Sequence, residues 1–414
     1  MQQLSFDSKN QIFSLGALTF AIQVFTFENL YEPDPSSTTY QNQENSCLVC
    51  SDSFVWAGGQ EKANGSLRIE GKIENGVYYF HVQAEHKSEN IRCTKLIIKN
   101  VPLGSISNLR QPYHQSKEFI IPMEGTILKY PDGFTGLYTP LVVVKLKEEK
   151  YTYFRSLDNR VRPKVFAMIP MGDTMDVELI FEECARKFSH FIDVPTWEIG
   201  FSSDYETIME KQKTIIQDNY GLQSWESRTD VPHWAKEISL VASIHCQHWT
   251  GYIFNNYDDV IKNLQTIGKK VDPHRVLAYL PGWEGRYYYQ YGDFRPCPRL
   301  GGEKGFQKLM DAVKEMGMHV MPMFMINGAN PHLENFWLWG QSSLYYSPSG
   351  FPQIWGSCDW DSSRHYDHNC GFPLNPGAPL WQDRLVGQVL SLIDRYGFDG
   401  VFMDLAAVYI NDPR

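Results

Sequence analysis

The chain has 414 residues, a mass of 47.8 kDa and a net charge of −10. Its length exceeds that of one ordinary domain. Its composition, with 43% hydrophobic and 21% charged residues, is typical of globular proteins and excludes a disordered or collagen-like chain. The negative charge argues against a general nucleic-acid binder, and the longest apolar runs, such as 141–144, are too short to cross a bilayer. We therefore expect a multidomain globular protein with neither nucleic acid nor membrane as partner.

The N-terminus and the cysteines bear on the cellular compartment. Residues 1–7 lack the basic region and apolar stretch of a signal peptide. The eight cysteines include one CxxC pair, Cys47 and Cys50, without a second pair at zinc-ribbon spacing. This pattern favours free thiols in a reducing compartment over a structural metal. We expect a cytoplasmic protein, unless a leader peptide has been removed.

Residues 1–190 have the pattern of a β-rich domain. An Asn-Gly pair at 75–76 separates two alternating segments, 67–73 and 77–82, which predicts a β-hairpin. Further strands are predicted at 94–99, 141–147, 150–155 and 177–181. Clusters of Pro, Gly and Ser separate these short strands, and no long helix is predicted. The region is therefore expected to form an antiparallel β-sandwich.

After residue 190 the pattern changes. Residues 191–234 are predicted to form a helical linker, with a helix over 205–220. From residue 235 onward strands alternate with helices: strands at 238–244, 276–280, 319–326 and 399–403, and helices at 257–267, 303–316 and 381–396. The second of these helices places Phe306, Leu309, Met310 and Val313 on one face, and Gly317 follows it as a C-terminal cap.

Four consecutive strand–helix units imply parallel strands with right-handed crossovers. Residues 244–251, after the first strand, contain no glycine-rich phosphate loop, which favours a (β/α)8 barrel over a doubly wound sheet. A barrel needs about 250 residues, whereas residues 235–414 end just past the fourth strand. The predicted fold is thus multidomain α and β: an antiparallel β-sandwich over 1–190, a helical linker over 191–234, and the first half of a (β/α)8 TIM barrel, truncated, over 235–414.

Polar and aromatic residues gather after the predicted barrel strands, where the working residues of such barrels lie. The candidates for substrate binding are His245, Trp283, Glu284, Asp293, Arg295 and Asn327. An indole ring can stack on a sugar, and charged or amide groups can hydrogen-bond its hydroxyls. Four of them have a structural alternative: packing for Trp283, a loop salt bridge for Asp293 with Arg295, and a solvated charge for Glu284.

Asp404 is the candidate catalytic residue, because it directly follows the apolar residues 401–403 at the end of the predicted fourth strand. A retaining glycosidase needs a carboxylate there to attack the anomeric carbon, with a second carboxyl group acting as acid and then base. The structural alternative is a carboxylate that caps a turn.

The segment 396–404, Tyr-Gly-Phe-Asp-Gly-Val-Phe-Met-Asp, resembles the fourth-strand segment of the retaining α-glycosidases, which include the α-amylase, α-glucosidase and α-galactosidase families. There an Asp-Gly pair and an apolar strand lead into the nucleophilic Asp, so the resemblance implies that role for Asp404. Residues 293–306 and 317–322 also resemble the second and third units of these barrels. An N-terminal β-sandwich is common in the glucosidase and galactosidase groups, and the whole layout is similar to a less studied bacterial group.

Departures from these families prevent the transfer of one activity. Phe402 stands where α-amylases have Arg and α-galactosidases have Lys, and residues 405–407 read Leu-Ala-Ala where α-glucosidases have Met-Asn-Glu. In these families the acid/base residue comes from a later strand, beyond Arg414. The resemblance implies a hydrolase of carbohydrate metabolism, a retaining glycosidase acting on an α-linked carbohydrate substrate; we assign no cofactor and no metal.

Other functions stay open. A non-catalytic carbohydrate-binding or scaffold protein is the alternative if the half-barrel is the natural product, since it would expose strand edges. A metal-dependent hydrolase would need His-x-His after the first strand, and His245 and His248 have the wrong spacing. Residues 358–370 concentrate Cys, Asp and His, but match no familiar zinc or calcium template. Substrate contacts or a simple ordered loop are favoured there.

Overall fold

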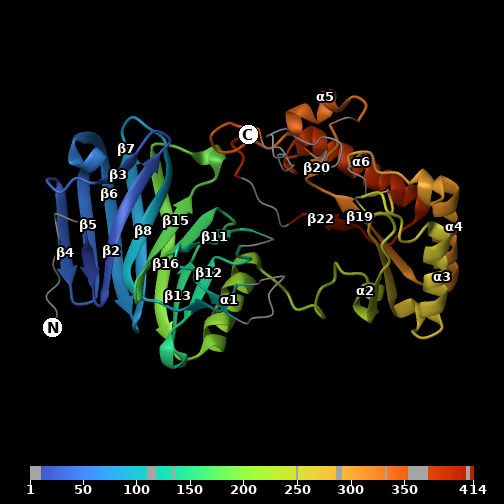
Figure 1. Cartoon of the computed structure of the whole chain (residues 1–414), viewed down its shortest axis with the longest axis horizontal. Coiled ribbons are helices and arrows are strands. Elements are labelled where there is room, and N and C mark those ends of the chain that lie inside the picture. Colours follow the sequence, from blue (N-terminus) through green and yellow to red (C-terminus); the bar gives the residue numbers. More distant parts are fainter. Residues whose placement is uncertain are drawn as a thin grey trace. The chain divides into compact units, whose positions relative to one another are not determined.

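The structure is a computed structural model that describes residues 11–109, 118–132, 136–248, 250–285, 291–331, 333–352, 372–406 and 411–414. The chain forms two compact units (Figure 1). Unit 1 comprises Met1–Leu222 and Ala407–Arg414, and unit 2 comprises Gln223–Ala406.

In the residues of unit 1 that the structure describes, sixteen strands form one antiparallel sheet. They are β1 Phe13–Leu15, β2 Leu18–Thr26, β3 Leu30–Pro33, β4 Thr38–Gln43, β5 Ser46–Trp56, β6 Glu61–Glu74, β7 Val77–His86, β8 Ile91–Pro102, β9 Ser105–Ile106, β10 Phe119–Ile120, β11 Thr126–Tyr130, β12 Leu141–Lys145, β13 Tyr151–Ser156, β14 Lys164–Met171, β15 Thr174–Glu182 and β16 Phe191–Ser202. Their order is β10-β9-β12-β13-β16-β7-β6-β5-β3-β2-β8-β15-β14-β11, with β1 beside β2 and β4 beside β5. Short 3₁₀ turns lie at Ala57–Gly59, Lys147–Glu149 and Ala185–Lys187.

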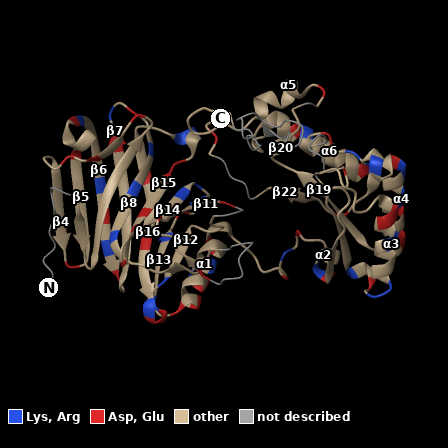
Figure 2. Ribbon diagram, viewed as in Figure 1, with Lys and Arg blue, Asp and Glu red and all other residues tan. Residues whose placement is uncertain are grey.

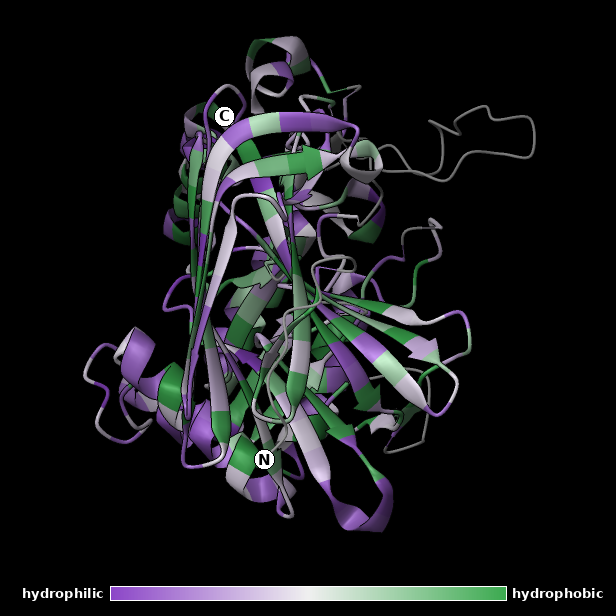
Figure 3. Ribbon diagram, turned by 90° about the vertical axis from the view of Figure 1, so that its left-hand side faces the viewer, coloured by the Kyte–Doolittle hydropathy of each residue, from purple (hydrophilic) through white to green (hydrophobic). Residues whose placement is uncertain are grey.

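The sheet of unit 1 folds into two layers over one hydrophobic core. Strand β3 joins the layers, because it pairs with β2 in one and with β5 in the other. Across the core Phe20 meets Phe80 with ring centroids 4.9 Å apart, and Phe166 meets Trp197 at 5.6 Å. Hydrophobic and hydrophilic residues alternate along the strands (Figure 3), so each strand turns one face toward the core. This arrangement is that of a β-sandwich.

The predicted hairpin is confirmed. Strands β6 and β7 pair antiparallel, with Ile73 opposite Tyr78. Between them Asn75 and Gly76 have φ of +51° and +77°, which is the left-handed geometry of a primed two-residue turn.

The region predicted as a helical linker differs in the structure. Residues 191–202 form β16, which pairs with both β7 and β13. Helix α1, Tyr205–Tyr220, has the predicted bounds, and its Ile208 packs against Leu141 and Val143 of β12. Both elements therefore belong to unit 1, and the units divide after Leu222 rather than at 190 or 234.

A buried ion pair holds α1 on the sheet. The Arg155 side chain is fully buried, and its Nη1 donates to the Glu198 carboxylate at 2.6 Å. Its Nε donates to Gln212 of α1 at 2.7 Å, and its Nη2 to the Ile208 carbonyl at 2.9 Å. One guanidinium thus satisfies acceptors on both the strand and the helix.

Unit 2 is built on a parallel sheet of order β17-β18-β19-β22. Its strands are β17 Leu240–Ser243, β18 Val276–Leu280, β19 His319–Met325 and β22 Phe402–Asp404, beside a small pair, β20 Gly328–Ala329 and β21 Phe372–Pro373. Its helices are α2 His233–Glu237, α3 Tyr257–Gly268, α4 Gly302–Met316, α5 Phe336–Trp339 and α6 Pro379–Tyr396, with 3₁₀ turns at Pro273–Arg275, Pro298–Leu300 and Gln341–Ser343. The predicted parallel order is confirmed, and a half-barrel is present. Within the described ranges, no helix is both long and apolar enough to span a membrane.

Helices α3, α4 and α6 pack on one face of the parallel sheet and share one core with it. Basic and acidic residues alternate along the outer sides of α3 and α4 (Figure 2), where Lys308 pairs with Asp258 at 2.8 Å. On the four strands Val241 and Phe402 are 54% and 38% exposed. The fourth strand, predicted at 399–403, begins at Phe402 and ends one residue later than predicted, with Asp404 as its last residue.

Candidate functional site

Buried polar side chains of unit 2 lie at one edge of the parallel sheet. Gln247 follows β17, Glu284 follows β18, and Asn327 and Asn330 follow β19; all are at most 2% exposed. Because the carboxyl ends of parallel strands meet at one edge, these residues share that edge with Asp404, the end of β22. The edge is the candidate functional site.

The backbone at Asp404 is held by the end of β19 and by the two residues that follow it. Met325 lies opposite Asp404 in the sheet, and the Ile326 N–H donates to the Asp404 carbonyl at 3.4 Å. The Asn327 side chain donates from Nδ2 to the carbonyl of Leu405 at 3.3 Å. Leu405 has φ of +61°, a left-handed conformation that is costly for a residue with a Cβ. A buried amide therefore fixes a strained turn directly after a half-buried carboxylate.

Trp283 is part of the core of unit 2. Its side chain is fully buried, and its indole stacks on Phe306 with centroids 4.9 Å apart. The indole N–H donates to the Met323 carbonyl at 2.8 Å. No ring face is therefore open to a sugar in this structure, in contrast to the expected stacking role; the large apolar ring gains more by packing against α4.

The hydroxyl of Tyr257 connects two loops of the site. It donates to the Trp283 carbonyl at 2.7 Å and accepts from the Cys297 N–H at 2.8 Å. Tyr257 is itself 1% exposed at the start of α3. Through one hydroxyl group, α3 thus positions the loop that carries Glu284 and the loop that precedes α4.

Glu284 is not the solvated loop charge considered as its alternative, because its side chain is fully buried. It lies near the thiols of Cys246 and Cys297. Burial raises the pKa of both thiols, and the negative charge of Glu284 raises each pKa further. The thiols therefore stay protonated at neutral pH and are poor nucleophiles.

The other candidates lie nearer the solvent. His245 is half-buried, its Nε2 lies 3.2 Å from the Gln247 carbonyl, and its own carbonyl accepts from Asn255 at 2.7 Å. Asp293 and Arg295 form an ion pair at 3.5 Å with side chains 36% and 61% exposed. This matches the loop salt bridge that the sequence left open, and an exposed pair of this kind can exchange partners at little cost.

Two patterns of the sequence contain metal-ligand types of side chain: the CxxC pair and residues 358–370. Cys47 faces the sandwich core, whereas Cys50 lies on the opposite side of β5, so the two thiols of the CxxC pair cannot ligate one ion. Residues 358–370 lie outside the described residues, as do Trp249 and residues 286–290. In the described ranges, no three His, Cys, Asp or Glu side chains form a group suited to a metal ion.

Sequence reasoning missed Gln247 and Tyr257 as parts of this edge. Gln247 stands in the polar run after the first strand, so its position was a usable signal. The role of Tyr257 depends on contacts with residues 26 and 40 positions away, and nothing local indicates it. The edge as a whole carries a half-buried carboxylate, buried amides and a half-buried imidazole, which are groups that can hydrogen-bond a polar ligand.

Comparison with solved structures finds the fold of an α-N-acetylgalactosaminidase, NagBb from Bifidobacterium bifidum. Its Gal-NHAc-DNJ complex aligns with a TM-score of 0.66 and 13% identity, covering 98% of this chain and 68% of that chain. The ligand-free form gives 0.63 and 13%, covering 99% and 70%. An α-galactosidase from Lactobacillus brevis gives 0.49 and 12%, covering 94% and 50%. At such identities the NagBb likeness shows a shared fold.

A comparison with curated proteins found no match. The family model described as "Domain of unknown function (DUF6259)" matches residues 199–413. These residues include the whole candidate site and the segment 396–404. Since the match covers more than half of this chain, the chain belongs to the DUF6259 family.

Proposed function

We propose that this chain carries part of the active site of a retaining glycoside hydrolase that acts on an α-linked carbohydrate, with Asp404 as the nucleophile. The observation that carries the proposal is the position of Asp404: the last residue of the fourth parallel strand, on a turn held by Asn327, at the edge where the buried polar residues gather. The fold shared with an α-N-acetylgalactosaminidase supports it.

We further propose that the parallel sheet is the first half of a (β/α)8 barrel. Helices pack on one of its faces, while Val241 and Phe402 are partly exposed. In a closed barrel such side chains would fill the interior. The acid/base carboxyl would then come from a strand in the second half, as in other retaining glycosidases.

In the proposed reaction a carboxylate oxygen of Asp404 attacks the anomeric carbon, and the bond from that carbon to the leaving oxygen breaks. The leaving oxygen takes the proton of the acid/base group. Water, deprotonated by the same group, then cleaves the glycosyl ester and restores the original configuration. His245, Asp293 and Arg295 have solvent-accessible side chains that can hydrogen-bond sugar hydroxyls. The buried Trp283 and Asn327 instead hold backbone carbonyls of the site, and Glu284 is fully buried.

The test is Asp404→Asn in the complete enzyme, assayed with aryl α-N-acetylgalactosaminide and aryl α-galactoside. Loss of the nucleophile should lower turnover at least about 10³-fold while the melting temperature stays near that of the parent. A 2-fluoro glycosyl substrate should label the parent at residue 404, as read by peptide mass spectrometry. The matched control is Asp383→Asn, an exposed carboxylate on α6. Undiminished turnover by Asp404→Asn would exclude the nucleophile role.

A further inference from the structure

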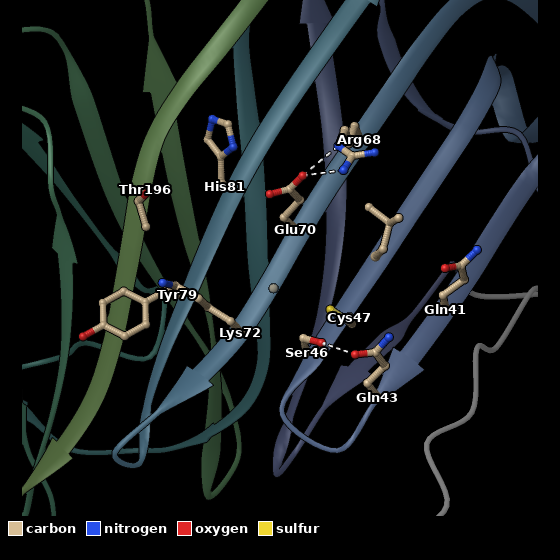
Figure 4. A pocket seen from close by; sticks show the side chains of 12 residues that line it. Gln41, Gln43, Ser46, Cys47, Arg68, Glu70, Lys72, Tyr79, His81 and Thr196 are labelled. Carbon is tan, nitrogen blue, oxygen red and sulfur yellow. Dashed lines mark hydrogen bonds and ion pairs between the residues drawn. The ribbon is translucent and has the colours of Figure 1, made fainter.

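The outer face of the sandwich in unit 1 carries a hollow of about 340 Å³. It extends over β4, β5, β6 and β7 and reaches Thr196 on β16 (Figure 4). Its volume lies near the lower end of the roughly 300–1,000 Å³ that small-molecule sites occupy. The hollow is thus large enough for a ligand of about one or two sugar rings.

Strand pairing brings the lining side chains together. The register sets Gln41 opposite Leu48, Leu48 opposite Glu70, and Glu70 opposite His81, one row across four strands. In the next row Lys72 lies opposite Tyr79. Because side chains on paired residues point to the same side of a sheet, both rows face outward. Rigid strands, rather than a loop, therefore set the spacing of these groups.

The charges of the hollow are neutralised locally. Ion pairs or hydrogen-bonded pairs join Arg68 to Glu70 at 2.8 Å, Lys72 to Glu74 at 2.8 Å, and His81 to Asp193 at 2.7 Å. Since Arg68 and Glu70 pair with each other and Lys72 pairs with Glu74, the hollow has no strong preference for an anion or a cation. A neutral ligand rich in hydrogen-bonding groups suits it best.

The remaining lining matches the two sides of a sugar. Leu48 and Tyr79 are half-buried and provide apolar surface, with the Lys72 ammonium 5.4 Å from the Tyr79 ring centroid. Around them stand an exposed amide from Gln41 and the carboxylate of Glu70. Hydroxyl groups both donate and accept hydrogen bonds, so they can pair with amide, carboxylate and ammonium groups at once, while sugar C–H faces pack on apolar surface.

We propose that this hollow is a binding site for a neutral oligosaccharide, separate from the candidate active site. The site would hold a carbohydrate chain on unit 1 whether or not unit 2 hydrolyses it. It does not rest on the identity of Asp404 as nucleophile.

The experiment uses the full chain in native gels that contain soluble galactomannan, starch or xyloglucan, followed by calorimetry with neutral tetrasaccharides from the polymer that retards it. Tyr79→Ala, His81→Ala and Glu70→Gln should each weaken binding about tenfold. Glu70→Gln keeps the shape of the side chain, so it still tests the site if Tyr79→Ala or His81→Ala fails to fold. The matched control, Gln23→Ala, alters a half-buried glutamine on β2 in the other layer and should bind as the parent does.

The outcomes separate this proposal from the proposed hydrolase. Binding that falls in the three hollow variants and persists in Asp404→Asn supports the oligosaccharide site. Binding that persists in all three hollow variants overturns it, and loss in Asp404→Asn alone would assign the binding to the candidate active site. If none of the three polysaccharides retards the chain, the oligosaccharide site is also overturned. That result would leave the proposed hydrolase activity untouched.

Discussion

Units 1 and 2 bury their polar side chains in different places. In unit 1 the buried charges pair with one another: Arg155 with Glu198 between the sheet and α1, and Lys164 with Asp158 at 2.6 Å. In unit 2 the buried polar groups lie after the strands, at the edge that ends in Asp404. Charges that pair within a core fix structure, whereas polar groups gathered at one edge of a parallel sheet are typical of a site. The difference agrees with the proposal that unit 2 carries the active site.

The two units also differ in how their sheets are covered. The sandwich layers of unit 1 cover each other, as the Phe20–Phe80 contact shows. The parallel sheet of unit 2 packs helices on one face and leaves Val241 and Phe402 partly exposed. Destabilising substitutions made separately in each unit therefore test whether the two cores unfold independently.

The largest expected effect is that of Trp283→Ala in the core of unit 2. Removal of a fully buried indole that stacks on Phe306 should lower the free energy of unfolding by about 4 kcal/mol. Hydrogen exchange should show the loss in unit 2. Trp225→Ala, which removes a tryptophan that is 49% exposed, is the control and should change little. An equal loss of hydrogen-exchange protection in unit 1 would show that the cores of the two units do not behave independently.

A smaller effect is expected from Glu198→Gln in unit 1. The change leaves the Arg155 guanidinium buried without its carboxylate, at a cost of about 3 kcal/mol. Chemical denaturation followed by exchange in β13 and α1 should report it. Glu74→Gln removes one partner of an exposed pair with Lys72 and should leave unfolding nearly unchanged. If Glu198→Gln is equally neutral, the buried pair does not hold α1 on the sheet.

The smallest effect is a pH dependence of unit 1 through Asp34. Burial alone would raise the pKa of this carboxyl, but hydrogen bonds from Lys62, Ser36 and Ser53 outweigh it and hold the pKa well below the usual 3.8. The folded pKa is thus the lower one, so the contribution is present above pH about 4 and is lost as pH falls through the folded pKa.

Asp34→Asn should therefore lower stability by about 2 kcal/mol at pH 7 and flatten its decline between pH 5 and 2. Thermal unfolding across that range measures both quantities. Asp52→Asn, at an exposed carboxylate on β5 of the same unit, is the control and should keep the slope of the parent. An unchanged slope in Asp34→Asn would remove Asp34 as a source of the acid sensitivity.

Much of the fold could be predicted because it depends on local periodicity. The apolar spacing of Phe306, Leu309, Met310 and Val313 gave α4 to within one residue, and the Asn-Gly pair gave the β6–β7 turn. The predictions failed where pairing with distant parts of the chain determines the secondary structure. Residues 191–202 became a central strand because β7 and β13 were available on both sides.

By itself the sequence determined the β-rich character of the first region, the alternation of strands and helices after residue 235, and the position of Asp404 at the end of a parallel strand. Only the tertiary structure decided that Trp283 and Glu284 are buried, that Asn327 holds the turn at Leu405, and that residues from separate strands line a hollow on the sandwich. The physical reason is that periodicity acts between near neighbours in the chain. Burial and hydrogen bonding depend on partners tens of residues away, such as Phe306 for Trp283.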